Sequence, residues 1–362
     1  MMYQYWFLRL AGVGNTKKRS LIEAFGSSEA VYKATRGDLR SYGLLEEGQI
    51  QRILEQGKAW DLEGEYRKFC MTGQSLVTLE QKEYPSMLAK VFDAPYGLHF
   101  LGELPPENAN MVAIVGSRNC SAYGQKMAQD LAKELGRRGY WVISGMARGI
   151  DAYAHQGCLD GGGKTVAVLG SGADVCYPRS NQVLYGRIQE RGCVLSEYAA
   201  GTPPLARQFP ARNRIISGMA RWVVVVEARE KSGSLITIDY ALEQGKDVYA
   251  VPGRMTDPLS RGCNGLIAQG AGIITSVEQF ISNIEEIEFL GISSHLSCQE
   301  EIFLLEKEEL LVYSCFDFYP KNIDTVLVES GLDLLTLLSI IMNLCDKGYL
   351  KEIFKNEYIK CK

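Results

Sequence analysis

The stretch RQFPARNRIISGMARWVVVVEA, residues 207–228, places four arginines ahead of an uninterrupted apolar run. The run WVVVV lacks the alternation of a half-exposed strand, so we expect both of its faces to be buried. Similar runs recur along the chain, separated by amphipathic segments of helical length: MVAIV, YWVIS, TVAVLG, CVLSE and DVYAVPG. Strands that alternate with helices predict an α/β fold with a doubly wound parallel sheet.

Small or polar residues follow almost every apolar run, which is where ligands bind in such sheets. The first of these turns is Gly116-Ser117-Arg118, ahead of a helix that should start near Ala122. A second turn, Ser232-Gly233-Ser234, also precedes a helix-like segment. Glycine and serine before a helix usually form only a turn and a cap. Two such turns on one rim predict phosphate binding at helix N-termini.

The arginines of the opening stretch strengthen this interpretation. Between Glu197 and Glu227 the sequence has no acidic residue, although it has Arg207, Arg212 and Arg214. The planar guanidinium group suits bidentate contact with phosphate oxygens. Phe209 admits two interpretations: it stacks on an unpaired base, or it packs into the core.

Four regions are expected along the chain. Residues 1–60 form a small helical domain with two helix–turn–helix outlines, 61–110 a connector that packs on the core, 111–290 the sheet domain, and 300–362 a winged-helix-like domain. Paired prolines at 105–106 mark a boundary. The tail from 301 carries eleven acidic residues against seven lysines and no arginine, which disfavours groove binding to DNA.

The N-terminal outlines resemble paired helix-hairpin-helix motifs. Gly12 and Gly14 would form the first turn, with Lys17 close enough to meet a phosphate, whereas Glu46 and Glu47 lie beside the second turn. The alternative is a helical packing module with solvated lysines.

The bulk composition excludes several protein classes. The 362 residues carry a formal net charge of −4, and no basic segment followed by an apolar stretch opens the chain. No run approaches 18 apolar residues, so no membrane span is expected. The ten cysteines form no CxxC pair, and there are three histidines, so no metal site is expected. Scattered thiols without a signal segment indicate a reducing cytoplasm.

The sequence assembles no evident catalytic site. The phosphate-cradling GxxxxGK[ST] motif is absent, and GSGAD at 170–174 lacks the third dinucleotide glycine, so no cofactor is expected. His155 is the only histidine of the core and fits an interior hydrogen-bonding role better than a catalytic base. One rival is a nucleotide-monophosphate phosphoribohydrolase, with Glu197 and Arg212 as its acidic and basic residues. A second rival is a structural adaptor.

Seven segments between 111 and 275 resemble, in order, the DNA-processing protein A family (DprA, also called Smf). They are IVGSRNCSAYG, VISGMARGIDAYAH, GKTVAVLGSGADVCYPRSNQVL, LSEY, FPARNRIISGMA, VVVVEAREKSGSLITIDYALEQGKDVYAVPG and SRGCNGLIAQGA. The resemblance implies a Rossmann-like core that binds single-stranded DNA, forms homodimers and loads the recombinase RecA during natural transformation, without catalytic turnover.

The resemblance also assigns residues by position. The family's phosphate-binding motif falls on Gly116, Ser117 and Arg118, and its FPxRNR segment falls on Phe209, Arg212, Asn213 and Arg214. Relatives carry a basic residue after a YP pair, here Arg179, and a lysine just before the phenylalanine, for which Arg207 is expected to substitute.

Overall fold

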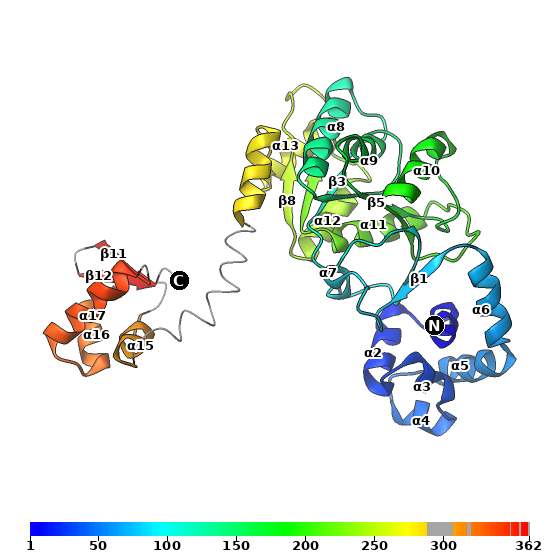
Figure 1. Cartoon of the computed structure of the whole chain (residues 1–362), viewed down its shortest axis with the longest axis horizontal. Coiled ribbons are helices and arrows are strands. Elements are labelled where there is room, and N and C mark those ends of the chain that lie inside the picture. The colour runs from blue at the N-terminus through cyan, green and yellow to red at the C-terminus, as the bar shows by residue number, and fades with distance from the viewer. Residues whose placement is uncertain (288–306, 317–319, 348, 355, 361–362) are drawn as a thin grey trace. The chain divides into compact units, whose positions relative to one another are not determined.

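The structure is a computed structural model that describes residues 1–287, 307–316, 320–347, 349–354 and 356–360 (Figure 1). The chain divides into two compact units, Met1–Phe280 and Ile281–Lys362, which we describe separately. The start of the first helix expected in the tail, at 302–306, lies outside the described residues.

A nine-stranded sheet forms the centre of the first unit, in the order β1-β2-β6-β5-β4-β3-β7-β8-β9. From β6 to β9 all neighbours pair in parallel, whereas β1 and β2 pair antiparallel at one edge. The strands are β1 Ser75–Thr78, β2 Gly97–Gly102, β3 Met111–Val115, β4 Trp141–Ser144, β5 Thr165–Leu169, β6 Cys193–Ser196, β7 Trp222–Val225, β8 Asp247–Ala250 and β9 Gly272–Ile273.

Helices cover both faces of this sheet. Val168 of β5 shares a core cluster with Ile215, whereas the next residue, Leu169, packs with Ile188 on the other face. The helices are α8 Ala122–Arg137, α9 Ile150–Asp160, α10 Gln182–Arg191, α11 Gln208–Met219, α12 Leu235–Glu243 and α13 Arg261–Ala268, with a 3-10 turn η1 Arg179–Asn181 and a further helix at 277–287.

The predicted doubly wound α/β fold is therefore confirmed. All six apolar runs became strands, and α8 begins at Ala122. From β3 the chain proceeds through β4 and β5 to β6, and then returns through α11 to β7 on the other side of β3. The strand order thus reverses between β3 and β7, and ligands of such sheets bind at this switch point. Strands β2 and β9 were not predicted from the sequence.

Six short helices precede the sheet: α1 Met2–Arg9, α2 Asn15–Phe25, α3 Ser28–Lys33, α4 Arg36–Ser41, α5 Glu47–Ala59 and α6 Leu62–Met71. Gly12 and Gly43 have φ angles of 76° and 77°, the left-handed conformation that the two expected turns require. The buried core of this region includes Trp6, Phe7 and Tyr96, so a residue just ahead of β2 completes it. Between β1 and β2 lies the one-turn helix α7, Ser86–Ala89.

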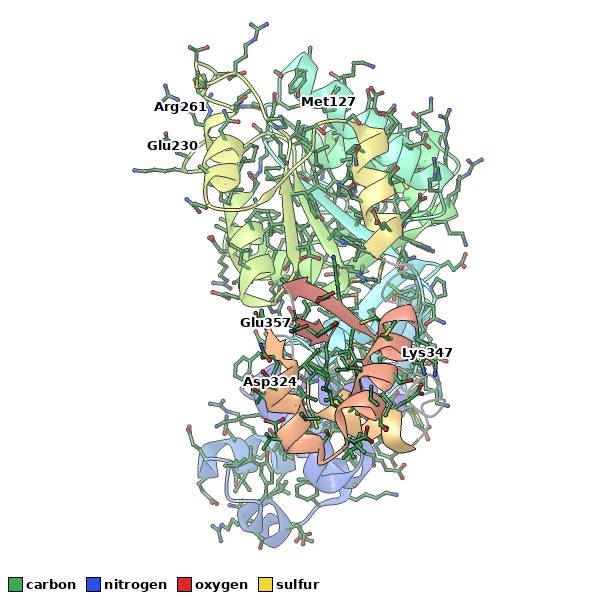
Figure 2. All side chains as sticks on the ribbon, turned by 90° about the vertical axis from the view of Figure 1, so that its left-hand side faces the viewer. Met127, Glu230, Arg261, Asp324, Lys347 and Glu357 are labelled. Atoms are coloured by element: carbon green, nitrogen blue, oxygen red, sulfur yellow. The ribbon has the colours of Figure 1, made fainter. Side chains whose placement is uncertain are left out.

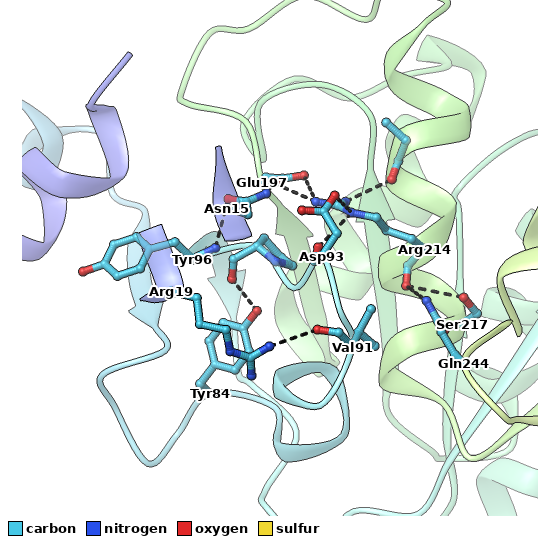
Figure 3. Close-up of polar contacts among 12 residues, drawn as sticks. Asn15, Arg19, Tyr84, Val91, Asp93, Tyr96, Glu197, Arg214, Ser217 and Gln244 are labelled. Carbon is cyan, nitrogen blue, oxygen red and sulfur yellow. Dashed lines mark hydrogen bonds and ion pairs between the residues drawn. The ribbon is translucent and has the colours of Figure 1, made fainter. Parts of the chain in front are cut away.

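Arg214 of α11 joins three parts of the first unit (Figure 3). Its Nη2 donates to both carboxylate oxygens of Glu197 at 2.9 Å, and its Nε donates to Asp93 Oδ2 at 3.2 Å. Glu197 Oε1 also accepts from Asn15 Nδ2 at 2.8 Å, and Asn15 Oδ1 accepts from the backbone N–H of Tyr96. The N-terminal helices, the connector and the sheet domain therefore share one polar cluster.

The described part of the second unit has a winged-helix outline: α15 Lys307–Ser314, β10 Lys321–Asn322, α16 Ile323–Ser330, α17 Leu334–Asp346 and the hairpin β11 Leu350–Phe354 and β12 Glu357–Lys360. Figure 2 labels Asp324, Lys347 and Glu357 on this unit. Among the described residues no single helix has the length and apolarity to cross a membrane. Together α16 and α17 pass that test by length and composition only, across a bend of 113°.

Replacing Glu197 with alanine should lower the free energy of unfolding by about 3 kcal/mol, because it leaves a buried guanidinium without its bidentate partner. The Arg214 and Glu197 side chains are only 9% and 19% exposed. Urea unfolding of the full chain measures the change. Asp93→Ala is the matched control: the Asp93 side chain is 52% exposed, so its removal should cost below about 1 kcal/mol. Equal losses would contradict this account.

Candidate functional site

A cleft of about 880 Å³ lies at the carboxyl ends of β3 and β7, the switch point of the sheet. The turns after both strands and the first half of α11 line it. The predicted residues among its lining are Gly116, Ser117, Arg118, Phe209, Arg212, Asn213, Ser232, Gly233 and Ser234. A smaller hollow of about 570 Å³ shares Arg118, Phe209 and Arg212 with the cleft and adds Arg179.

Close packing explains the glycine of the first turn. A Cβ on Gly116 would lie 2.7 Å from Ile150 Cγ1 and 3.0 Å from the carbonyl oxygen of Glu227. The N–H of Ser117 donates to that same carbonyl at 2.7 Å, so it is not free for an anion. The Ser117 hydroxyl accepts from the N–H of Asn119 and retains its own proton to donate.

The N-terminus of α8, which we expected to face a phosphate, is capped from within the protein. The Glu227 carboxylate accepts from the N–H of Ser121 at 2.9 Å and from the Ser121 hydroxyl, which in turn accepts from the N–H of Gly124 at 3.1 Å. A buried carboxylate thus occupies the position where the helix dipole favours an anion. The positive charge of this turn therefore comes from the Arg118 side chain.

Arg118 belongs to a stack of side chains. Its guanidinium lies 5.8 Å from the ring centroid of Phe209, and that ring stacks on Tyr177 at 5.5 Å with an interplanar angle of 29°. Tyr177 is 45% exposed, so one aromatic ring of the stack remains available to a ligand. Phe209 is half-buried, and a Cβ on Gly170 would lie 2.9 Å from its ring. Phe209 therefore packs against Gly170 and Tyr177, and its stacking on an unpaired base stays a prediction.

Arg212 is fixed by the ends of two strands. It is 5% exposed, and its Nη1 donates to the carbonyl of Gly145, after β4, at 2.7 Å and to the carbonyl of Val168 in β5. Burial lowers the pKa of Arg212 to about 10, with Asp151 acting in the opposite direction. Burial also raises the pKa of the Asp151 carboxyl, which Arg212 opposes. Arg212 therefore stabilises the floor of the cleft as well as adding charge to it.

Two further predicted arginines lie outside the cleft lining. Arg214 pairs with Glu197 and Asp93. The sequence has no carboxylate between Glu197 and Glu227, but the fold brings these two carboxylates to Arg214. Arg207 is exposed at the residue before α11 and is not among the residues that line either hollow. Asn213, between the two buried arginines, does line the cleft.

Four cationic or aromatic lining residues were missing from the predicted set. Arg229 and Lys231 line the main cleft, Arg148 lines the smaller hollow, and Tyr177 lines both. Arg148, Arg229 and Lys231 stand in the polar stretches that follow strands, SGMARGID and EAREKSGS, and that position was the available signal. The stacking of Tyr177 on Phe209 joins residues 32 positions apart, which no local pattern indicates.

The second turn leaves the N-terminus of α12 with fewer internal contacts. No Ser234 side-chain cap closes this helix, and a Cβ on Gly233 would meet no atom within 4 Å. The Ser232 and Ser234 hydroxyls lie 2.8 Å apart. This turn therefore offers two hydroxyls and the exposed backbone of Gly233 to the cleft that Arg118 also lines.

The residues of the phosphoribohydrolase rival are not brought together. Glu197 is not among the residues that line either hollow and binds Arg214 and Asn15 instead. Of the serines that end strands, Ser144 donates to the carbonyl of Ile114 and Ser196 donates to that of Ser171.

The residues of the first N-terminal turn form hydrogen bonds within the N-terminal helical region. Lys17 Nζ donates to Gln49 Oε1 at 2.7 Å and lies 3.9 Å from a carboxylate oxygen of Glu46. Gln49 Nε2 donates to the carbonyl of Gly12 at 2.9 Å, and Gly14 precedes α2 as its N-cap. DNA contact by Gly12, Gly14 and Lys17 stays a prediction, and the structure adds a carboxylate beside the lysine.

His155 has an interior position in α9. Thr165 Oγ1 donates to the carbonyl of Val142 at 2.6 Å, so at its 2.7 Å contact with His155 it accepts from Nδ1–H. The histidine is therefore neutral with its proton on Nδ1. Burial, helped by Arg212, lowers the pKa of His155 to about 3.

Comparison with known proteins gives consistent matches. The family model described as DNA recombination-mediator protein A matches residues 75–285. DNA processing protein DprA from Streptococcus pneumoniae is 46% identical over 206 residues, 56% of this chain and 71% of that relative. The X-ray structure of DprA from Streptococcus pneumoniae has a TM-score of 0.69 at 36% identity and covers 78% of this chain and 97% of that chain. DNA processing protein A from Helicobacter pylori, described for its unique single-stranded DNA binding mode, has a TM-score of 0.53 at 28% identity, covering 59% of this chain and 96% of that chain.

His155 should make the protein less stable as the pH falls below 6.5, its ordinary pKa. Below this pH the unfolded chain binds a proton at His155. The folded chain does not bind that proton until the pH falls to about 3. One such proton changes the free energy of unfolding by about 1.4 kcal/mol per pH unit. Asparagine at 155 keeps an amide donor for Thr165 and does not titrate. Urea unfolding at pH 7 and pH 5 should show a smaller pH effect in His155→Asn.

His99 does not disturb that comparison. Burial lowers the pKa of His99 to about 4, which gives an effect of the same sign in both proteins. Identical pH dependence of the original protein and the asparagine variant would show that His155 is protonated in the folded state.

Proposed function

This chain belongs to the DNA recombination-mediator protein A family, and on that premise we propose that it binds single-stranded DNA in the switch-point cleft. The observation that carries the proposal is the stack of Arg118, Phe209 and Tyr177 in the lining of the cleft. Proteins that bind single strands combine cations that follow the phosphates with aromatic rings that stack on unpaired bases. The relative from Helicobacter pylori, described for its single-stranded DNA binding mode, supports the proposal.

Separate roles follow for the two kinds of side chain. Arg118, Arg148, Arg179, Arg229 and Lys231 line the two hollows and are exposed, so they would meet the phosphates of the strand. The exposed Tyr177 ring would stack on a base. The Ser117, Ser232 and Ser234 hydroxyls and the Asn213 amide would complete the phosphate contacts, whereas Arg212 would hold the floor in place.

The wider role follows from the family. We propose that the bound strand is protected and transferred to a RecA recombinase during natural transformation, and that the protein acts as a homodimer without catalytic turnover. In this role the strand leaves chemically unchanged, because the cleft supplies binding groups rather than a nucleophile paired with a base.

Arg118→Ala should weaken binding of an oligothymidine by about 1–3 kcal/mol, the range for charge-assisted hydrogen bonds. Each lost phosphate contact should also lower the salt slope of the affinity by about 0.7. Fluorescence anisotropy of a labelled strand at several salt concentrations measures both quantities. Arg118 is a better probe than Arg212, whose replacement would also release the carbonyls of Gly145 and Val168.

Arg187→Ala provides the matched control for charge. Arg187 forms an ion pair with Asp160 and is not among the residues that line the two hollows. Its replacement should leave the affinity and the salt slope unchanged. An equal loss in both variants would point to general electrostatic attraction in place of the proposed cleft.

Tyr177→Ala should weaken strand binding by about 1–3 kcal/mol, the usual effect of removing a ring that stacks on a base, whereas Tyr177→Phe should retain the affinity.

Competition with unlabelled DNA tests the preference for single strands. Duplex of equal length should compete poorly, because its bases are already stacked inside the helix. Full competition by duplex would refute single-strand selectivity.

A further inference from the structure

A second cleft, of about 740 Å³, lies at the amino ends of the parallel strands, whereas the first cleft lies at their carboxyl ends. Trp222 and Asp247 are paired first residues of the parallel strands β7 and β8. Arg221 and Lys246, which immediately precede them, both line this cleft, so it opens at the amino ends of these strands. The segment around α7 forms another wall, which includes Lys90 and Phe92.

Three of the four cations that line this cleft lack an ion-pair partner among the described residues. No carboxylate lies within ion-pairing distance of Lys90, Arg221 or Lys246, whereas Arg214 pairs with Glu197 and Asp93. The parallel register places Arg221 and Lys246 on neighbouring strands. Burial, together with Lys90, lowers the pKa of Lys246 to about 8, so the two ammonium groups are close enough to repel each other. A bound anion would relieve that repulsion.

The wall of this cleft adds a feature that an inorganic anion would not use. The ring of Phe92 is 82% exposed and offers a face for stacking. Gln244 is not available as a further contact, because its Nε2 donates to the carbonyl of Arg214 at 3.0 Å (Figure 3) and its Oε1 is buried.

We infer that this amino-edge cleft binds a nucleoside 5′-monophosphate. The phosphate contacts Lys90, Arg221 and Lys246, and the base stacks on Phe92. Three exposed carboxylates, Asp93, Glu243 and Asp247, also line the cleft, and with the fourth cation, Arg214, the lining keeps only a modest excess of positive charge. That excess suits a monophosphate better than a triphosphate. The inference concerns the sheet edge away from the proposed strand-binding cleft and does not depend on it.

Isothermal titration of the full chain with 2′-deoxyadenosine 5′-monophosphate tests this site. Lys246→Met should weaken binding about tenfold or more, since it removes a charge-assisted contact and keeps the length of the side chain. Phe92→Ala should weaken it at least about fivefold, and because this side chain is exposed the variant should fold normally. Deoxyadenosine, which lacks the phosphate, should bind more weakly.

Arg118→Ala separates this site from the first cleft and should leave nucleotide binding unchanged. In that variant, a short oligodeoxyadenosine with and without a 5′-phosphate distinguishes the two sources of the ligand. If the 5′-phosphate strengthens binding of the oligonucleotide, the ligand of this cleft is the 5′ end of a DNA strand. If it does not, the ligand is a free nucleotide. Loss of nucleotide binding in Arg118→Ala, with Lys246→Met and Phe92→Ala unaffected, would overturn the inference, as would absence of binding to the original protein. Lys246 would then serve only the carbonyl of Gly218 at the end of α11, to which its Nζ donates at 3.3 Å.

Discussion

Two buried guanidinium groups on one helix determine where the cleft lies. A buried arginine must satisfy its donors, and α11 does so in two directions. Arg212 binds the carbonyls at the ends of β4 and β5, while Arg214 binds Glu197 after β6 and Asp93 from the connector. The helix that returns the chain from β6 to β7 is therefore fixed against three strand ends. Its first turn, with Phe209, then lies at the mouth of the switch point.

The fold was predictable because its strands are continuous apolar runs, a local property of the sequence. WVVVV and MVAIV became adjacent parallel strands, and glycine and serine after β3 marked the binding edge. The antiparallel strand β2 was missed, since GLHFLG lies between proline-rich segments and pairs with residues almost a hundred positions away. Residues 116–118, 209, 212, 213 and 232–234 of the predicted site do line one cleft.

The direction of individual side chains was not predictable. Arg212 and Arg214 are two residues apart on a helix, which places them on different faces, and the carboxylates that neutralise Arg214 come from positions 93 and 197. The cap of α8 was not predictable either, because Glu227, which accepts from the N–H of Ser121, is more than a hundred residues away in the sequence. A glycine-serine turn before a helix therefore indicates where an anion could bind, whereas the tertiary contacts decide whether the helix end is free.

The contact between Phe209 and Tyr177 has a consequence for the thermodynamics of recognition. The Phe209 ring packs against Tyr177 and against Gly170, so the conformational entropy of the stacked rings is lost during folding. An arriving nucleobase meets a rigid platform and loses mainly its own mobility. Selectivity then rests on the partner: a flexible strand can present a splayed base at little cost, and a base held in a double helix must first be extracted.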